Sequence, residues 1–279
     1  MIFLIDNYET TYHTQSLYLH TAFDKMGHQS VMSNFAANSV FDLFDTVKPE
    51  VVITSALRLS KDILFYFSEN KDLGIKLLLN VDNIKEEDLI HLKDYMASQG
   101  VVPNLLFTSN YSLPDKIGRL NVLKLLPAAD DNQVQSLDFD YNIDKAIITD
   151  SLNDEMKYSS SFHVVSMNPD LNGKADICLP CVGIRSIYDK YNEIIFKDMN
   201  NVSQGFFDAL RRGKKVYYQN KQDTGIQEKI NKIFKIDCNL DYSSEKKTED
   251  FSQLKEIVAQ KHTGDNRAKT ILSQVKGTL

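Results

Sequence analysis

The chain has 279 residues, of which 42% are apolar and 25% charged, a balance typical of folded globular proteins. This length exceeds one ordinary hydrophobic core and favours two domains. The net charge of −6 argues against a general polyanion-binding protein. No apolar run approaches the roughly 20 residues of a membrane-spanning helix. Residues 1–6 do not resemble a secretory signal, so we expect a cytoplasmic protein.

The first half of the chain alternates short apolar runs, which predict strands, with stretches of helical periodicity. Gly27 follows the first such stretch, as a helix C-terminal cap does. We expect strands at 2–5, 30–33, 51–54, 76–81, 105–108 and 122–125. We expect helices at 16–26, 40–47, 61–67 and 86–98.

A polar and acidic stretch, 131–144, predicts a linker, and the same alternation then resumes. We expect strands at 146–149, 162–166, 177–179, 194–196 and 216–218, and helices at 203–211, 226–234, 251–260 and 267–275. The alternation predicts an α/β fold with parallel sheets, helices on both faces and right-handed crossovers. We therefore divide the chain into an N-terminal domain (1–130), the linker, and a C-terminal domain (145–279). The polar segment 241–252 holds little that a core could bury.

The segment 200–218 carries the clearest chemical pattern. Ser203 can cap a helix, and Gly205 keeps its first turn free of side chains. The helix start at Gln204 then offers free N–H groups and positive dipole charge to an anion. Asp208, one turn further, can accept hydrogen bonds from a ribose diol, and Gly213 ends the helix. Alone, the segment also fits an amphipathic helix with a solvated acid.

This segment resembles the nucleotide-sugar-binding turn of GT-B glycosyltransferases, in which a glycine, apolar residues, an acid, an alanine and a later glycine precede an apolar strand. Asp208 stands where that family usually has the glutamate that holds the nucleotide ribose, and Gly205 and Gly213 fall on two family glycines. The chain departs from the family at Asn200, where many members have a second glutamate. One branch has an arginine at the position of Gly205.

Three other segments occur in the family's order, so the resemblance covers most of the chain. The segment 125–130 resembles the end of the family's first domain. The segment 182–196 resembles a glycine turn, a helix and a strand of the second domain. The segment 262–272 resembles the last helices of the spore-coat-maturation-like branch. The resemblance implies two Rossmann-like domains facing a cleft. It implies a hexosyl- or pentosyltransferase that moves a sugar from a nucleotide-diphosphate donor, with a UDP-sugar favoured, to a hydroxyl.

Further donor contacts are expected at the carboxyl ends of the strands. The Arg185 guanidinium can bind a diphosphate bidentately, with an exposed helix-start arginine as the alternative, and Lys221 is a weaker candidate. In the loop after the first strand, Thr14 and Gln15 can line the cleft. His13 can act as a general base, because its ordinary pKa lies near 6.5, or it is a surface histidine.

Asp82 follows a very apolar strand and is the other candidate base, for an inverting displacement. The alternative is a turn cap for the following helix, and a retaining mechanism is equally open. An Asp-x-Asp motif is absent where a metal-bound diphosphate would need one, so no metal is implied, although magnesium could accompany the diphosphate.

The acceptor is the least determined part. The short chain without tryptophan resembles phage glycosyltransferases that modify hydroxymethylated pyrimidines in DNA, which would place it in the host cytoplasm. Two basic groups could contact DNA or be ordinary solvated surface: Arg211, Arg212, Lys214 and Lys215, and Lys116, Arg119 and Lys124. A protein, glycolipid or polysaccharide acceptor is the alternative.

Two other classes stay open. One is a non-catalytic module that binds a nucleotide or sugar. The other is a response-regulator-like or redox α/β protein, for which Cys178 and Cys181 have the spacing of a reactive pair. Their apolar surroundings, and those of Cys238, favour buried and unreactive thiols.

Overall fold

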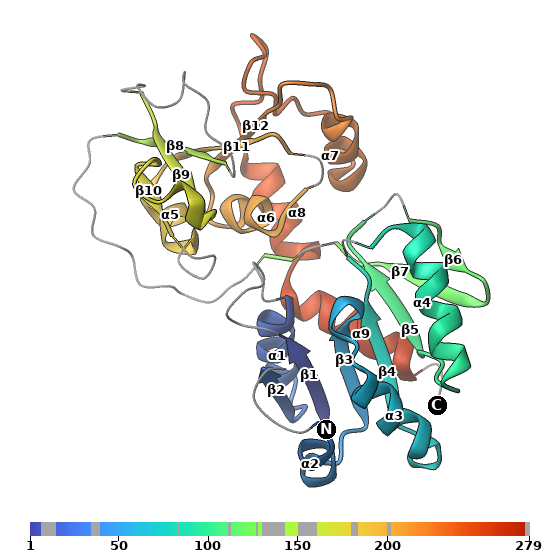
Figure 1. Cartoon of the computed structure of the whole chain (residues 1–279). Helices are drawn as coiled ribbons and strands as arrows, with labels where there is room; N and C mark the ends of the chain where they lie inside the picture. Colours follow the sequence, from blue (N-terminus) through green and yellow to red (C-terminus); the bar gives the residue numbers. More distant parts are fainter. Residues whose placement is uncertain are drawn as a thin grey trace. The chain divides into compact units, whose positions relative to one another are not determined.

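A computed structural model describes residues 1–6, 15–34, 40–82, 84–110, 113–126, 128–129, 143–149, 161–179, 184–199 and 202–276. The chain divides into two compact units (Figure 1). Unit 1 comprises Met1–Leu126 together with Gly264–Leu279, and unit 2 comprises Pro127–Thr263. The division predicted from the sequence differs in two respects. It assigns the last helix to the C-terminal domain, and it ends the N-terminal domain at residue 130 and adds a linker, whereas unit 2 begins at Pro127. Most of the expected linker, 131–144, lies outside the described residues.

Unit 1 contains one mainly parallel sheet with the strand order β2-β1-β3-β4-β5-β7-β6. Its strands are β1 (Ile2–Asp6), β2 (Ser30–Asn34), β3 (Val51–Ser55), β4 (Lys76–Asn80), β5 (Leu105–Thr108), β6 (Lys116–Ile117) and β7 (Leu120–Lys124). Its helices are α1 (Gln15–Lys25), α2 (Val40–Val47), α3 (Lys61–Glu69), α4 (Glu86–Ser98) and α9 (Gly264–Lys276), with short 3₁₀ turns η1 (Ala56–Arg58) and η2 (Lys71–Leu73). The β6–β7 hairpin is antiparallel.

Both faces of this sheet are buried, which explains why its strands read as continuous apolar runs. Leu77 and Leu79 of β4 belong to a core cluster with residues of α2, α3 and α4, such as Phe44 and Ile63. Leu78 points to the other face and is also fully buried. The parallel sheet predicted from the sequence is therefore confirmed in unit 1.

The C-terminal helix α9 belongs to unit 1 because it packs against α1. At its start, a Cβ on Gly264 would lie 3.3 Å from the Tyr18 carbonyl oxygen, so the two backbones approach closely. The buried Arg267 donates from Nε to the carbonyl oxygen of Leu126, where β7 has just ended. These contacts join segments far apart in the sequence, which periodicity cannot reveal.

Unit 2 contains a parallel sheet with the strand order β10-β9-β8-β11-β12 (Figure 1). Its strands are β8 (Lys145–Ile148), β9 (His163–Ser166), β10 (Ile177–Cys178), β11 (Glu193–Lys197) and β12 (Lys215–Gln219). Its helices are α5 (Ile184–Lys190), α6 (Gln204–Arg211), α7 (Ile226–Phe234) and α8 (Ser252–Lys261), with a 3₁₀ turn η3 (Pro169–Leu171). These elements match the predicted strands and helices to within a few residues.

The polar segment 241–252 is held by hydrogen bonds and by ring contacts of Tyr242 and Phe251 with Tyr217. Thr248 exchanges two hydrogen bonds with the backbone of Asn239, at 2.7 and 2.9 Å. The Asn239 amide also donates to Ser244 Oγ at 2.7 Å, and the Tyr217 hydroxyl donates to the Thr248 carbonyl at 2.9 Å. Side-chain amides and hydroxyls thus supplement the aromatic contacts that hold this segment.

Candidate functional site

The sheet of unit 2 changes its winding direction between β8 and β11. From β8 the chain adds β9 and β10 on one side, whereas β11 and β12 lie on the other. In an open parallel sheet, a crevice for ligands forms beyond the carboxyl ends of the strands at such a point. β11 borders this point, and the chain that leaves its carboxyl end leads into α6. The helix expected to receive an anion therefore follows a strand of the switch point.

Both ends of α6 are formed as the sequence predicted. Ser203 has extended backbone angles, φ −82° and ψ 165°, and its Oγ accepts the N–H of Phe206 at 3.3 Å. At the other end, Gly213 has φ +76°, and its N–H donates to the Leu210 carbonyl at 2.9 Å. The cap leaves the N–H groups at the very start of the helix without intrahelical partners, as in any α-helix.

Gln204, the first residue of α6, carries an unsatisfied amide. Its side chain is buried, with 4% of the residue exposed, and among the described residues neither Nε2 nor Oε1 has a hydrogen-bond partner. Burying an amide without a partner costs free energy, and buried polar groups in folded proteins are nearly always paired. Gln204 therefore places an amide that can still donate and accept a hydrogen bond at the positive end of a helix.

Gly205 has a packing role in the structure. A Cβ at this position would overlap the Tyr188 hydroxyl of α5 and lie 3.3 Å from the Phe196 ring of β11. The residue thus allows α6 to approach its neighbours inside unit 2. The role predicted from the sequence, a helix start free of side chains for an anion, is a separate one.

Asp208 lies one turn into α6 and is only 3% exposed. The adjacent Phe207 ring stacks against the buried His262 ring, with 5.0 Å between centroids. Because Asp208 is buried, it is not the solvated acid that the alternative interpretation places there. A carboxylate in such a place requires polar or charged partners.

In unit 1, Asp82 follows the carboxyl end of β4 as predicted, and its Oδ1 is held by the end of β5. This oxygen accepts hydrogen bonds from Thr108 Oγ1 at 2.8 Å, the Ser109 N–H at 2.6 Å and Ser109 Oγ at 2.9 Å. The turn that leads to Asp82 is closed by Asn80, whose Oδ1 accepts the Asp82 N–H at 2.8 Å. The side chain that closes this turn is therefore that of Asn80. Asp82 instead connects the end of β4 to the end of β5.

The other predicted contacts are described in part or not at all. His13 and Thr14 lie outside the described residues. Gln15 opens α1 and Arg185 lies in the first turn of α5, but the description of both is limited to the backbone. Lys221 is exposed, and its backbone N–H donates to Asp198 Oδ1 at 3.3 Å.

Several of the basic residues serve their own unit. The Arg212 guanidinium donates to both carboxylate oxygens of Asp189, at 2.6 and 2.8 Å, and Lys214 donates to the Asp189 carbonyl at 3.0 Å. Lys124 donates to the carbonyls of Asn110, Leu113 and Pro114. Burial lowers the pKa of the Lys214 and Lys124 ammonium groups. By contrast, Lys116, Arg119 and Lys215 are exposed.

The described cysteines behave as packing residues. Cys238 is buried, and burial raises the pKa of its thiol to about 11, which keeps it protonated and unreactive. Cys178 is half-buried and donates to the Asn168 carbonyl at 3.4 Å, whereas Cys181 lies outside the described residues. Within the described ranges, no cluster of three or more His, Cys, Asp or Glu side chains is placed to hold a metal ion.

The described helices include none that is long and apolar enough to cross a bilayer. Neither protein-family models nor curated protein sequences match the chain. Among solved structures, HepE of Anabaena, in complex with UDP and glucose, aligns with a TM-score of 0.47 and 9% identity over 98% of this chain and 94% of that one. The NAD⁺-bound 3-phosphoglycerate dehydrogenase of Entamoeba histolytica aligns with a TM-score of 0.25 and 10% identity, over 99% and 94%.

Proposed function

We propose that the chain is a glycosyltransferase that takes its sugar from a nucleotide-diphosphate donor, a UDP-sugar above all, and that the start of α6 binds this donor. The observation that carries the proposal is the buried, unpaired carboxamide of Gln204 at the capped N-terminus of a helix that follows a switch-point strand. The resemblance of 200–218 to the nucleotide-sugar-binding turn of GT-B enzymes supports the same placement.

In this proposal the donor diphosphate lies at the N-terminus of α6. The free N–H groups and the helix dipole favour negative charge there. The Gln204 amide donates to a phosphate oxygen and accepts from a sugar hydroxyl, which satisfies both of its orphan atoms. Asp208 holds the ribose diol, and Arg185 neutralises the charge that develops on the leaving diphosphate.

The reaction is the attack of an acceptor hydroxyl on the anomeric carbon of the sugar. The bond from that carbon to the diphosphate oxygen breaks, and a base removes the hydroxyl proton. We assign the base to Asp82, a carboxylate at the carboxyl end of β4 whose position is fixed by three hydrogen bonds to its Oδ1. His13 is the second candidate, with Thr14 and Gln15 beside it at the donor, and the stereochemical outcome stays open.

For the acceptor, we propose a hydroxymethylated pyrimidine in DNA, with a protein, glycolipid or polysaccharide hydroxyl as the alternative. Of the two basic groups named above, Lys116, Arg119 and Lys215 are exposed. Arg212, Lys214 and Lys124 instead make hydrogen bonds within their own unit. A DNA acceptor predicts binding that weakens steeply with salt. A glycan or peptide acceptor predicts little salt dependence.

The test is ligand-induced thermal stabilisation by UDP, UDP-glucose and UDP-N-acetylglucosamine, with ADP-glucose and GDP-mannose in parallel. A ligand at 100 times its Kd stabilises the folded state by about 2.7 kcal/mol. We expect Gln204→Leu to abolish the shift while the free protein stays equally stable or gains stability, because the variant removes two unsatisfied buried atoms. Asp208→Asn should also abolish the shift.

Gln227→Leu is the matched control. The Gln227 amide is fully engaged in the same unit: Nε2 donates to the Cys238 carbonyl at 2.6 Å, and Oε1 accepts the Leu240 N–H at 2.9 Å. This variant should lower the stability of the free protein by about 1–3 kcal/mol and leave the ligand shift intact. A full shift in Gln204→Leu, or no shift with any nucleotide sugar, would refute the proposed donor site.

Donor hydrolysis separates the enzyme from a binding module. Slow release of UDP and free sugar without acceptor is expected of a glycosyltransferase. A protein that gives the thermal shift, yet releases no UDP with or without the candidate acceptors, is a non-catalytic module.

A further inference from the structure

Unit 1 contains a pocket that takes no part in the proposed sugar transfer. It has a volume of about 640 Å³, within the roughly 300–1,000 Å³ of pockets that bind small molecules. Its walls include Val51 and Lys76, the first residues of β3 and β4, so it lies at the amino-terminal edge of the sheet. Asp82 follows the opposite end of β4, and the two sites are therefore separated by the length of the strands.

The pocket, which we call the Leu73 pocket, offers apolar surface to a ligand. Leu73 is 63% exposed although it is a large aliphatic side chain. Gly74 follows with φ +66°, and a Cβ at this position would meet no heavy atom of the described residues within 4 Å. The Tyr66 and Phe44 rings form another wall, packed edge to face with 4.9 Å between centroids.

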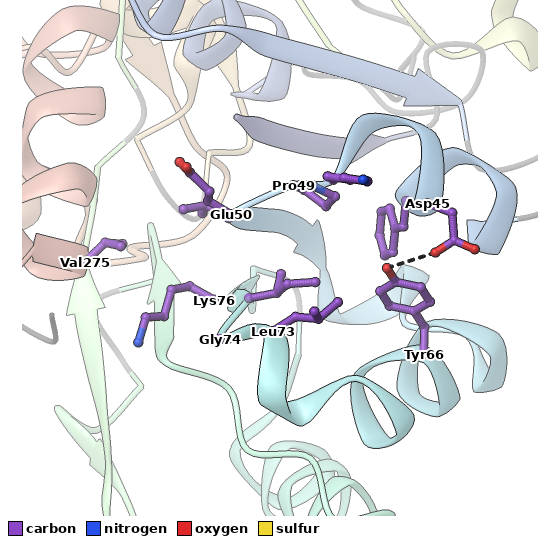
Figure 2. A pocket seen from close by; sticks show the side chains of 12 residues that line it. Asp45, Pro49, Glu50, Tyr66, Leu73, Gly74, Lys76 and Val275 are labelled. Atoms are coloured by element: carbon purple, nitrogen blue, oxygen red, sulfur yellow. Dashed lines mark hydrogen bonds between the residues drawn. The ribbon is translucent and has the colours of Figure 1, made fainter.

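The charges at the pocket leave positive groups free. Glu50 Oε2 pairs with the N-terminal ammonium at 2.9 Å, and Asp45 Oδ1 accepts a hydrogen bond from the Tyr66 hydroxyl at 3.4 Å. Within the described part of the chain, Lys48 and Lys76 have no acidic partner, although both line the pocket. Figure 2 shows Tyr66 and Asp45 on one side of the pocket, Glu50 and Lys76 on the other, and Leu73 between them.

We propose that the Leu73 pocket binds a small amphipathic anion. The apolar or aromatic body of the ligand packs on the exposed Leu73 side chain, and its carboxylate or phosphate head is neutralised by Lys48 and Lys76. Charge complementarity selects an anion, because Glu50 is paired with the N-terminal ammonium, and two lysines then face one carboxylate, Asp45, whose partner is the neutral Tyr66 hydroxyl. The proposal is independent of the donor site at α6.

Isothermal titration of the full chain with octanoate, octyl phosphate and octylammonium tests this assignment. We expect saturable one-site binding of one or both anions and at least tenfold weaker binding of the cation. The stronger of octanoate and octyl phosphate identifies the head group. Leu73→Asp should weaken anion binding more than tenfold, because it places a like charge on the apolar wall.

Matched variants locate the site. Leu57→Asp changes another exposed leucine of unit 1, 66% exposed in a 3₁₀ turn, and should leave the affinity within about twofold. Lys48→Gln and Lys76→Gln should each weaken binding about two- to fivefold, as expected for exposed charge pairs. Lys61→Gln, an exposed lysine of α3 outside the pocket lining, should have no effect.

Three results would overturn the proposal: no saturable binding of either anion, equal binding of octylammonium, or equal losses in Leu73→Asp and Leu57→Asp. Self-association that Leu73→Asp abolishes would also do so, because a second copy would then cover the pocket. Gln204→Leu should bind the anion normally, so failure here and failure of the donor site are distinguishable.

Discussion

Tyr217 and Tyr218 are neighbours in β12, and both are buried. Burial raises the pKa of each phenol from the usual 10 to about 12, with further contributions from Glu193 for Tyr217 and from Asp241 for Tyr218. The folded-state pKa thus lies above the unfolded one. The stabilisation is complete below pH 10 and is lost as the pH rises towards 12, since the unfolded chain then releases these protons first.

We therefore predict that the free energy of unfolding falls more steeply between pH 10 and 11.5 in the parent protein than in the variant with both Tyr217→Phe and Tyr218→Phe. Urea unfolding at several pH values measures this slope. The variant loses some stability at every pH, because the Tyr217 hydroxyl no longer donates to Thr248. Tyr95→Phe, at an exposed tyrosine, is the control, and equal slopes in all three proteins would contradict the assignment.

Single residues also show where sequence reasoning reaches its limit. Ser203 and Gly213 could be placed at the ends of α6, because capping depends on neighbours in the sequence. The lack of a hydrogen-bond partner for the Gln204 amide among the described residues could not be predicted, because it depends on how the surrounding elements pack. Asp82 lies at its expected strand end, but the three donors on its Oδ1 come from β5 and the residue after it, 26 and 27 positions away.

At the scale of elements, the packing of α6 against α5 and β11 depends on one missing side chain. Gly205 faces the Tyr188 hydroxyl, which a Cβ would overlap. We predict that Gly205→Ala destabilises the protein by about 1–3 kcal/mol, the usual cost of overpacking, although alanine favours helix formation. Chemical denaturation measures the loss.

The double variant with Gly205→Ala and Tyr188→Phe separates this contact from other causes. Removal of the hydroxyl should recover part of the loss, although the added Cβ still lies 3.2 Å from the ring carbon that carries it. The interaction energy from the four proteins of the cycle should therefore be favourable and exceed about 0.5 kcal/mol. Additive effects would show that the strain lies elsewhere.

The elements that the sequence predicted well are those with local signals. Apolar runs marked β3, β4 and β11, and helical periodicity marked α4 and α7, because the face that each element buries is encoded within it. The hairpin strand β6 was missed because two residues give no period. The order of the segment 241–252 also escaped prediction, since it arises from hydrogen bonds of Asn239 and Thr248 and from contacts of Tyr242 and Phe251 with Tyr217, which local polarity does not reveal.

At the scale of the whole molecule, the sequence predicts two α/β units and assigns the last helix to the second, whereas α9 packs against α1 of unit 1. A boundary drawn along the sequence cannot show that the last helix returns to the first unit. The contact at Gly264 and the hydrogen bond from Arg267 to Leu126 are the physical basis of that return. The division of the molecule has a direct experimental consequence.

We predict that truncation after Thr263 destabilises unit 1 and spares unit 2. Without α9, the face of α1 that it covers becomes exposed, and the end of β7 loses the Arg267 hydrogen bond. Hydrogen–deuterium exchange should show lost protection in β1 and α1, with protection retained in β11, α6 and β12. Gly264→Leu, which forces a side chain against the Tyr18 backbone, should give the same pattern more weakly. If exchange instead increases in β11 and β12, the last helix stabilises the second unit, and the division at residue 145 drawn from the sequence is the better description.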